Sequence, residues 1–205
     1  SLNVGFRAAK GDYLGIVESD DYILPDMCKT LYEVAEANGL DFVKSDFYKI
    51  WGHGKTRRSI REKTCNKPGY YCEILDPSEN LDLFNMQMMT WTGLYRRAFL
   101  EKHGIVHNES PGASYQDNGF WFQTFCWARR IMVVPKAFYC YRQDNSASSI
   151  NQDNKVYAMF DEYAWIRDFL RRNPQIEERF LGVFHYKKTH NLNFILSILD
   201  KRFRG

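Results

Sequence analysis

The sequence lacks the features of a membrane-spanning or disulfide-stabilised protein. No stretch approaches the roughly 20 apolar residues that a transmembrane helix requires, and the chain does not open with a secretory signal. The five cysteines are odd in number and irregularly spaced. A disulfide framework is therefore not expected, and a reducing compartment is favoured. We expect a cytoplasmic protein.

The chain also has little excess charge of either sign. Its net charge is +3, from 28 basic and 25 acidic residues, which is too small to argue for a nucleic-acid partner. The segment 51–68 is polar and basic and predicts a loop or hairpin. As a nucleic-acid binder it would show steeply salt-dependent binding, but a solvated surface is the commoner role of such a charge run. With 205 residues the chain can form one compact domain with a substantial core.

The most informative feature is a group of acids that directly follows the apolar run 13–17: Glu18, Asp20 and Asp21. Neighbouring carboxylates repel one another unless a cation intervenes. Mg²⁺ and Mn²⁺ bind such oxygens together with substrate phosphates, so the group indicates a metal-diphosphate site. An ordinary strand-to-helix turn uses the same residue types, with Asp21 capping the helix that Pro25 opens. Spacing alone leaves both interpretations open.

Residues 3–26 resemble the central signature of the family-two glycosyltransferases, which have the GT-A fold. They contain, in the family's order, a short helix, a Gly-Asp-Tyr turn, an apolar strand, an acidic tetrad and Pro25. Glu18 stands where the family's D-x-D motif usually has Asp, so the charge is kept on a longer side chain. The resemblance implies that Asp20 and Glu18 hold Mn²⁺ or Mg²⁺. It also implies that both residues and Asp21 help to bind the donor diphosphate.

A second block, 114–122, resembles the family's E-D-x-x-F element, which supplies the catalytic base at the start of a helix. Gln116 replaces the usual Glu, and Asp117 keeps the position of the base. A helix N-terminus keeps a carboxylate ionised through its dipole and its free amide groups. Taken alone, Asp117 would be better explained as an N-cap.

A third block, 137–149, resembles the Y-x-Y-R and S-x-S elements that close the family's catalytic domain. The resemblance implies that Arg142 and the following serines line the diphosphate pocket. A surface Arg in a loop is the commoner case, and the alternating aromatic residues would also suit a half-buried strand. The stretch 91–100 is similar to the family's strand-to-helix segment ahead of the acceptor region.

The family domain begins with two nucleoside-binding strands, and nothing similar precedes Asn3. We therefore expect the chain to begin inside the domain, with residues 1–2 left from expression. Residues 1–150 are expected to form the later part of a GT-A α/β domain, a mixed sheet flanked by helices, and residues 151–205 a helical extension. One edge of the sheet would then be open, which predicts that the chain forms a homodimer, swaps a strand with another copy or is hard to keep soluble. A monomer in size-exclusion chromatography with light scattering would contradict this.

Periodicity and helix breakers predict the remaining elements. Helices are expected at 25–38, 78–89, 96–103, 117–130, 153–172 and 174–201. Strands are expected at 13–17, 42–43, 131–134 and 137–142, with the first two in parallel βαβ order. The last helix is basic and amphipathic and could rest on the inner face of a membrane. Packing on the core is the more ordinary explanation.

Together the three blocks imply a glycosyltransferase that moves a sugar from a nucleotide-diphosphate donor to a hydroxyl of a glycan or lipid-linked acceptor, as in cell-surface polysaccharide synthesis. The cation would neutralise the departing diphosphate. Asp117 would take the proton of the acceptor hydroxyl, and direct displacement would invert the anomeric centre. The alternative is a non-catalytic fragment that binds nucleotide-sugar or carbohydrate. Calorimetry with Mn²⁺ and nucleotide-sugars would test binding in either case.

Overall fold

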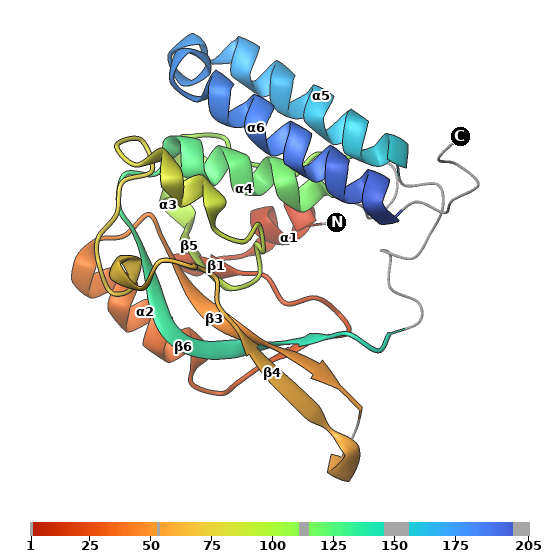
Figure 1. The fold of residues 1–205 in the computed structure, drawn as a ribbon. Helices are drawn as coiled ribbons and strands as arrows, with labels where there is room; N and C mark the ends of the chain where they lie inside the picture. The colour runs from red at the N-terminus through yellow and green to blue at the C-terminus, as the bar shows by residue number, and fades with distance from the viewer. Residues whose placement is uncertain (1, 53, 111–114, 146–155, 199–205) are drawn as a thin grey trace.

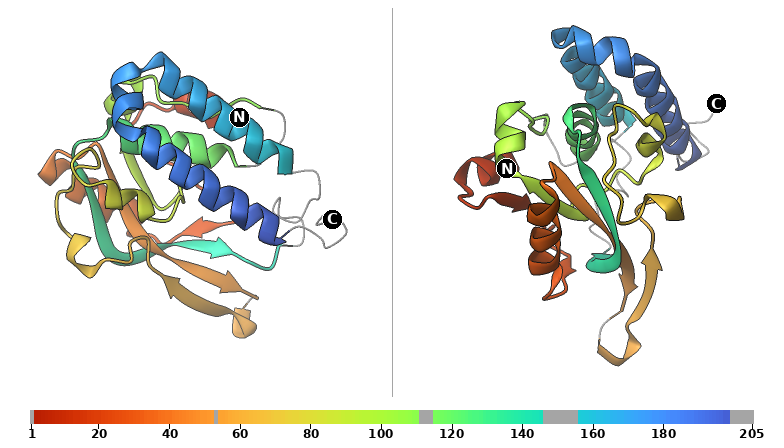
Figure 2. Two further views of the ribbon diagram at one scale, coloured as in Figure 1. Left: turned by 45° about the horizontal axis from the view of Figure 1, so that its top comes forward. Right: turned by 90° about the vertical axis from the view of Figure 1, so that its left-hand side faces the viewer.

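A computed structural model of the chain has a mixed sheet as its middle layer, with helices on both faces (Figure 1, Figure 2). Helix α2 (Met27–Asn38) covers one face. Helix α4 (Gln116–Trp127) covers the other, and α5 (Val156–Arg172) and α6 (Pro174–Ile198) pack on α4 as a third layer. This confirms the expected α/β class. The structure describes residues 2–52, 54–110, 115–145 and 156–198.

The sheet has the strand order β1-β5-β3-β6-β2, and β4 pairs with the outer part of β3. Among the named strands of the described residues, β3 and β6 pair in parallel and the other pairs are antiparallel. Strands β1 and β3 run in the same direction and are joined through α2, as predicted, and β5 lies between them in the sheet. The strands are β1 (Tyr13–Gly15), β2 (Tyr22–Ile23), β3 (Phe42–Trp51), β4 (Arg58–Glu62), β5 (Gly93–Arg96) and β6 (Ile131–Arg142).

Each face of the sheet has its own hydrophobic core. Neighbouring residues of a strand point to opposite faces, so Phe42 belongs to the core under α4 and Val43 to the core under α2. Helix α2 contributes Met27, Leu31 and Ala35 to the second core. Their four-residue spacing places them on one side of the helix. The central strands are therefore buried from both sides and give the site a rigid base.

The helices predicted from clear stop signals are confirmed. Helix α2 ends at Gly39, which has a φ of 56° and donates its N–H to carbonyls of the last turn. Glycine adopts this left-handed conformation without a steric penalty, and it commonly ends helices. Helices α1 (Leu2–Ala8) and α3 (Arg97–Lys102) also lie where the sequence places them.

The prediction of a helix at 78–89 is wrong. Only a short 3₁₀ turn, η3 (Leu81–Asn85), forms there. Two polar side chains compete with the helical pattern: Asp76 accepts from the Ser78 N–H at 2.7 Å, and Asn80 accepts from the Asp82 N–H at 3.2 Å. Such local bonds satisfy backbone groups without a helix.

The two strands predicted around Pro135 form one continuous strand, β6. Its pairing with β3 shifts register beside Asp46, where Val134 and Ala137 pair with successive residues of β3. The extra residues form a bulge, and a bulge tolerates a proline that cannot donate to the ladder. The sequence correctly marks an irregularity there but not that the strand continues through it.

The basic segment 51–68 contains β4, which pairs with the outer part of β3. The resulting β3–β4 hairpin projects from the body (Figure 1). Its base is fixed by Asp46, which is 1% exposed. The Asp46 carboxylate accepts from Arg61 at 2.9 Å, from the Tyr71 hydroxyl at 2.7 Å and from the Thr64 N–H at 3.0 Å. A buried carboxylate with three donors is fully compensated, so the hairpin leaves the body in a defined direction.

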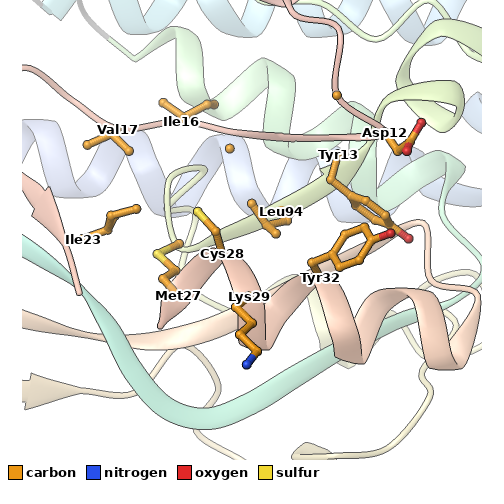
Figure 3. A pocket seen from close by; sticks show the side chains of 12 residues that line it. Asp12, Tyr13, Ile16, Val17, Ile23, Met27, Cys28, Lys29, Tyr32 and Leu94 are labelled. Carbon is orange, nitrogen blue, oxygen red and sulfur yellow. The ribbon is translucent and has the colours of Figure 1, made fainter. Parts of the chain in front are cut away.

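Strand β1 lies at the end of the strand order, beside an apolar groove of about 540 Å³. Figure 3 shows Ile16 and Val17 on one side of this groove and Met27 of α2 on the other. Val17 is 51% exposed. Unpaired strand edges and open apolar surface both favour association. The homodimer nevertheless stays a prediction.

Helix α6 packs on the core through Phe180, Phe184 and Ile195, while Phe194 and Leu196 are exposed. In the described ranges, no helix combines the length and the apolar character that crossing a bilayer requires. Contact of α6 with a membrane surface, the cytoplasmic location and the division of the chain at residue 150 stay predictions.

Candidate functional site

The acidic corner, defined here as residues 18–21, is the turn between β1 and β2. The Asp21 N–H donates to the Glu18 carbonyl at 3.1 Å, and this bond closes the turn. Strand β2 then pairs with β6 at Tyr139 and Cys140. The corner consequently lies beside the end of β6, so the first and third sequence blocks meet in space.

Tyr139 and Arg142 hold the corner in place. The Tyr139 hydroxyl donates to Oδ2 of Asp21 at 2.8 Å and accepts from the Glu18 N–H at 3.0 Å. The Arg142 N–H donates to Oδ1 of Asp21 at 2.8 Å. Both oxygens of Asp21 thus attach the corner to β6. Asp21 thus has a structural role, and its part in donor binding stays a prediction.

Asp20 and Glu18 are the other two acids of the corner. Asn145 donates to Oδ2 of Asp20 at 2.8 Å. The pKa of Glu18 is raised, first by partial burial and then by the charges of Asp21 and Asp20. Burial also raises the pKa of Asp21, against the bonds from Arg142 and Tyr139. The corner therefore carries more negative charge than its surroundings compensate, and a bound cation would relieve this.

The donor set of the corner suits a hard cation. Asp20 and Glu18 offer carboxylate oxygens, and Mg²⁺ is commonly held by one or two carboxylates together with substrate phosphates. Over the part of the chain that the structure describes, no three His, Cys, Asp or Glu side chains could hold a metal ion by themselves.

Arg142 lies against the same corner. Its Nε donates to the Asp20 carbonyl at 3.2 Å, and its Nη1 lies 3.4 Å from Asp144. The guanidinium is therefore beside the acids, where a diphosphate would need a cationic partner. Its predicted contact with the donor stays a prediction. The serines at 146–149 lie outside the described residues.

Asp117 occupies the first turn of α4, as the sequence predicts. The residue before the helix, Tyr115, has a φ of 65°, which is unusual for a residue with a side chain. Burial raises the pKa of Asp117 to about 6, although its own N–H and that of Asn118 donate to the carboxylate. The charge of Glu18 raises this pKa further. A carboxylate with a pKa near neutrality is suited to accept a proton.

The predicted base and the acidic corner are close enough to interact electrostatically. Besides the effect of Glu18 on Asp117, the pKa of Tyr141 is raised by burial and then by the charges of Asp21, Asp20 and Asp117. The charges of both groups therefore act on Tyr141, which lies near the end of β6. Segments almost a hundred residues apart in the chain are brought together by the curled sheet.

Trp91 packs against the two tyrosines of β6 that lie near the acidic corner, Tyr139 and Tyr141. Trp91 stacks on Tyr139 with ring centroids 4.2 Å apart and contacts Tyr141 at 5.0 Å. Trp91 is buried, with 6% of its surface exposed. Its ring therefore holds the two tyrosines in place, and its face is not available to stack on a sugar.

One residue near Asp117, Glu162, was not predicted from the sequence. Glu162 of α5 is 1% exposed, and the charge of Asp117 contributes to raising its pKa. A signal was present: Met159, Tyr163 and Ile166 form the buried stripe of α5, and Glu162 lies within it. A carboxylate on the apolar side of a helix needs a partner or a function.

Comparison with known proteins agrees with this geometry. Residues 1–104 match the family Glycosyl transferase family 2. The uncharacterized glycosyltransferase EpsJ of Bacillus subtilis strain 168 is 30% identical over 152 residues, which are 72% of this chain and 43% of that protein. Glycosyltransferase GlyG of Streptococcus pneumoniae serotype 4 is 39% identical over 173 residues, or 82% of this chain and 53% of that protein.

The fold is similar to that of S. aureus TarS. The structure of TarS 1–349 in complex with UDP-GlcNAc superposes with a TM-score of 0.56 at 20% identity, covering 79% of this chain and 44% of that one. At this identity the likeness concerns the fold, and it confirms the GT-A expectation. The chain spans about half the length of the curated relatives it matches. This chain belongs to glycosyl transferase family 2.

Proposed function

We propose that the full-length protein containing this chain transfers a sugar from a nucleotide-diphosphate donor to a hydroxyl of a glycan or lipid-linked acceptor, with inversion, in the synthesis of a cell-surface polysaccharide. The main support is electrostatic. The charge of Glu18 raises the pKa of Asp117, so the candidate base lies within electrostatic range of the candidate diphosphate site. Family membership supports the reaction class.

Each candidate residue has a separate role in the proposed reaction. Above a pH of about 6 Asp117 is ionised and takes the proton of the attacking hydroxyl. Arg142, held against the Asp20 carbonyl, contributes positive charge beside the diphosphate. Asp20 and Glu18 would hold a divalent cation, which would supply further charge stabilisation to the departing group. Because a single base serves a direct displacement, the product has the inverted configuration.

A nucleotide-sugar donor is supported by the structural neighbours, since TarS structures are described in complex with UDP-GlcNAc and with UDP. The base and the sugar of the donor used here are open to measurement. A panel of nucleotide-sugars, titrated calorimetrically with and without Mn²⁺, identifies the donor. Binding without any turnover of glycan or lipid-linked acceptors would favour the alternative, a non-catalytic binding protein.

The metal site is tested with Asp20→Asn in the full-length protein. The change keeps the Asn145 contact but removes half of the charge offered to the cation. We expect kcat/KM to fall by at least about 100-fold and the Mn²⁺ concentration for half-maximal activity to rise.

The matched control for this test is Asp26→Asn. Asp26 lies next to α2, and its only described ion pair is a 3.9 Å contact with Lys136. It should leave both quantities near the native values. An Asp20→Asn variant with native turnover and native Mn²⁺ dependence would remove Asp20 from the site.

A further inference from the structure

Glu162 reaches from the helical pair into the first turn of α4. Its Oε1 accepts from the Gly119 N–H at 2.8 Å, and its Oε2 accepts from Nδ2 of Asn108 at 2.9 Å. Gly119 is two residues beyond Asp117 and closes the same turn. An anion at this end of a helix also interacts favourably with the helix dipole. The contact therefore acts on the backbone that carries the candidate base.

The fit between α4 and α5 at this point depends on a glycine. A Cβ atom on Gly119 would overlap both the Glu162 carboxylate and the Trp165 ring. The absence of a side chain lets the carboxylate approach the backbone N–H directly. This close approach, together with two hydrogen bonds and near-complete burial, leaves Glu162 little freedom to move.

We propose that Glu162 is a positioning residue for Asp117: from α5 it holds the first turn of α4 and thereby fixes the direction in which the Asp117 carboxylate points. The proposal rests on the proposed function, in which Asp117 is the catalytic base. It assigns to the helical pair a part in the reaction, although that pair lies outside residues 1–104, which match the family.

The surroundings of the two acids determine the pH dependence to expect. Burial raises the pKa of Glu162 to about 7, against the bonds from Asn108 and Gly119, and the charge of Asp117 adds to this. Around Glu162 the other titratable groups are Tyr163 on α5, Lys187 on α6, which lies over the Trp121 ring, and His107, which lies against Gln116. Around Asp117 they are Glu18, Tyr95, Tyr115 and Tyr141.

Few of these neighbours change charge between pH 5.5 and 7.5. Burial lowers the pKa of His107 to about 4, so it is already neutral, and burial lowers that of Lys187 to about 8, so it is still largely charged. Burial raises the pKa values of the tyrosines, which stay protonated. The pKa of Glu18 is raised as well, and Glu18→Gln removes its titration from the profile. Asp117 itself titrates near pH 6, so ionisation of Glu162 is expected as a second, higher step near pH 7.

The test compares two variants of the full-length protein. Glu162→Ala removes both hydrogen bonds, and we expect kcat to fall by about 10-fold to 100-fold with little change in the KM of the donor, because misplaced catalytic groups lose rate. Glu162→Gln keeps an oxygen for the Gly119 N–H. At pH 6, where the native carboxyl is mostly protonated, it should retain at least about half of the native rate. Its rate profile should lose the step near pH 7 that the native enzyme shows.

Glu177→Ala is the matched control, since it removes the Arg167–Glu177 ion pair of the same helical pair without touching α4. It should leave the rate profile unchanged. If Glu162→Ala does not fold, the profile of Glu162→Gln decides. A native kcat and profile in the Glu162 variants, with Asp117→Asn inactive, would overturn the positioning role alone. Activity in Asp117→Asn would instead overturn the proposed function.

Discussion

The variant Asp117→Asn is expected to lose sugar transfer by about 10³-fold or more in the full-length protein, because a general base typically contributes two to four orders of magnitude. The amide is nearly isosteric and can still accept from the N–H of Asn118, so the first turn of α4 should persist. Donor binding should remain within a few-fold of native, since the proposed diphosphate contacts lie in the acidic corner. Initial rates and calorimetry measure the two effects separately.

The same substitution should stabilise the protein at high pH. The pKa of Asp117 is about 6 in the folded chain and 3.8 in the reference state. Between these values the unfolded chain releases a proton that the folded chain retains. The contribution of Asp117 to the free energy of unfolding is therefore fully present below about pH 4 and is lost as the pH rises through 6. Removing the charge should therefore raise the free energy of unfolding by on the order of 2 kcal/mol at pH 8.

Urea unfolding at pH 4 and pH 8 distinguishes this effect from a general one. Asp117→Asn should differ from native at pH 8 and resemble it at pH 4. Asp26→Asn, on the exposed end of α2, should show no such difference. Equal stability of native and Asp117→Asn at pH 8 would mean that the Asp117 carboxylate is not desolvated in the folded protein.

Gly93→Ala is expected to have the largest effect on folding. Gly93 begins β5 and pairs with Lys44 of β3. A Cβ there would overlap the carbonyl oxygen of Val43 and stand 3.1 Å from the Cα of Lys44. These are backbone atoms of the central strand, so they cannot move aside as a flexible side chain does. We expect a loss of about 4 kcal/mol or more, or no folded protein.

Gly182→Ala is the control for Gly93→Ala. Apart from its chain neighbours and the backbone of its own helix, no atom of the described residues lies within 4 Å of the position that its Cβ would take in α6. Alanine favours helix over glycine by up to about 1 kcal/mol, so this variant should be neutral or slightly stabilised. A Gly93→Ala protein with a native urea midpoint would show that β3 and β5 are farther apart than described.

The parts of the fold that could be predicted are those with local causes. The apolar spacing in α2 and the glycine that ends it depend only on neighbours in the chain, and the helix predicted at 25–38 is confirmed. The helix at 78–89 fails for an equally local reason, the turn-forming side chains of Asp76 and Asn80. The insertion of β5 between β1 and β3 has no local signal and could not be predicted from periodicity.

The candidate site was predictable only through its motifs. The acidic corner and Asp117 each have a plain structural explanation, and their proximity depends on how the sheet curls. Lys44 illustrates what periodicity misses: it is fully buried and donates to the Met89 carbonyl and to Thr92 and Tyr95 side chains. Burial lowers its pKa to about 7. A strand pattern alone would place such a lysine at the surface.

The enclosure of α4 restricts how proteins with this architecture can diversify. Every residue from Asn118 to Cys126 is buried between the sheet and the helical pair. A substitution that reshapes this helix must be matched by changes in two other layers at once. The projecting β3–β4 hairpin is under no such constraint, since four of the five residues of β4 are exposed. Sequence change is therefore tolerated more readily in the hairpin than in α4.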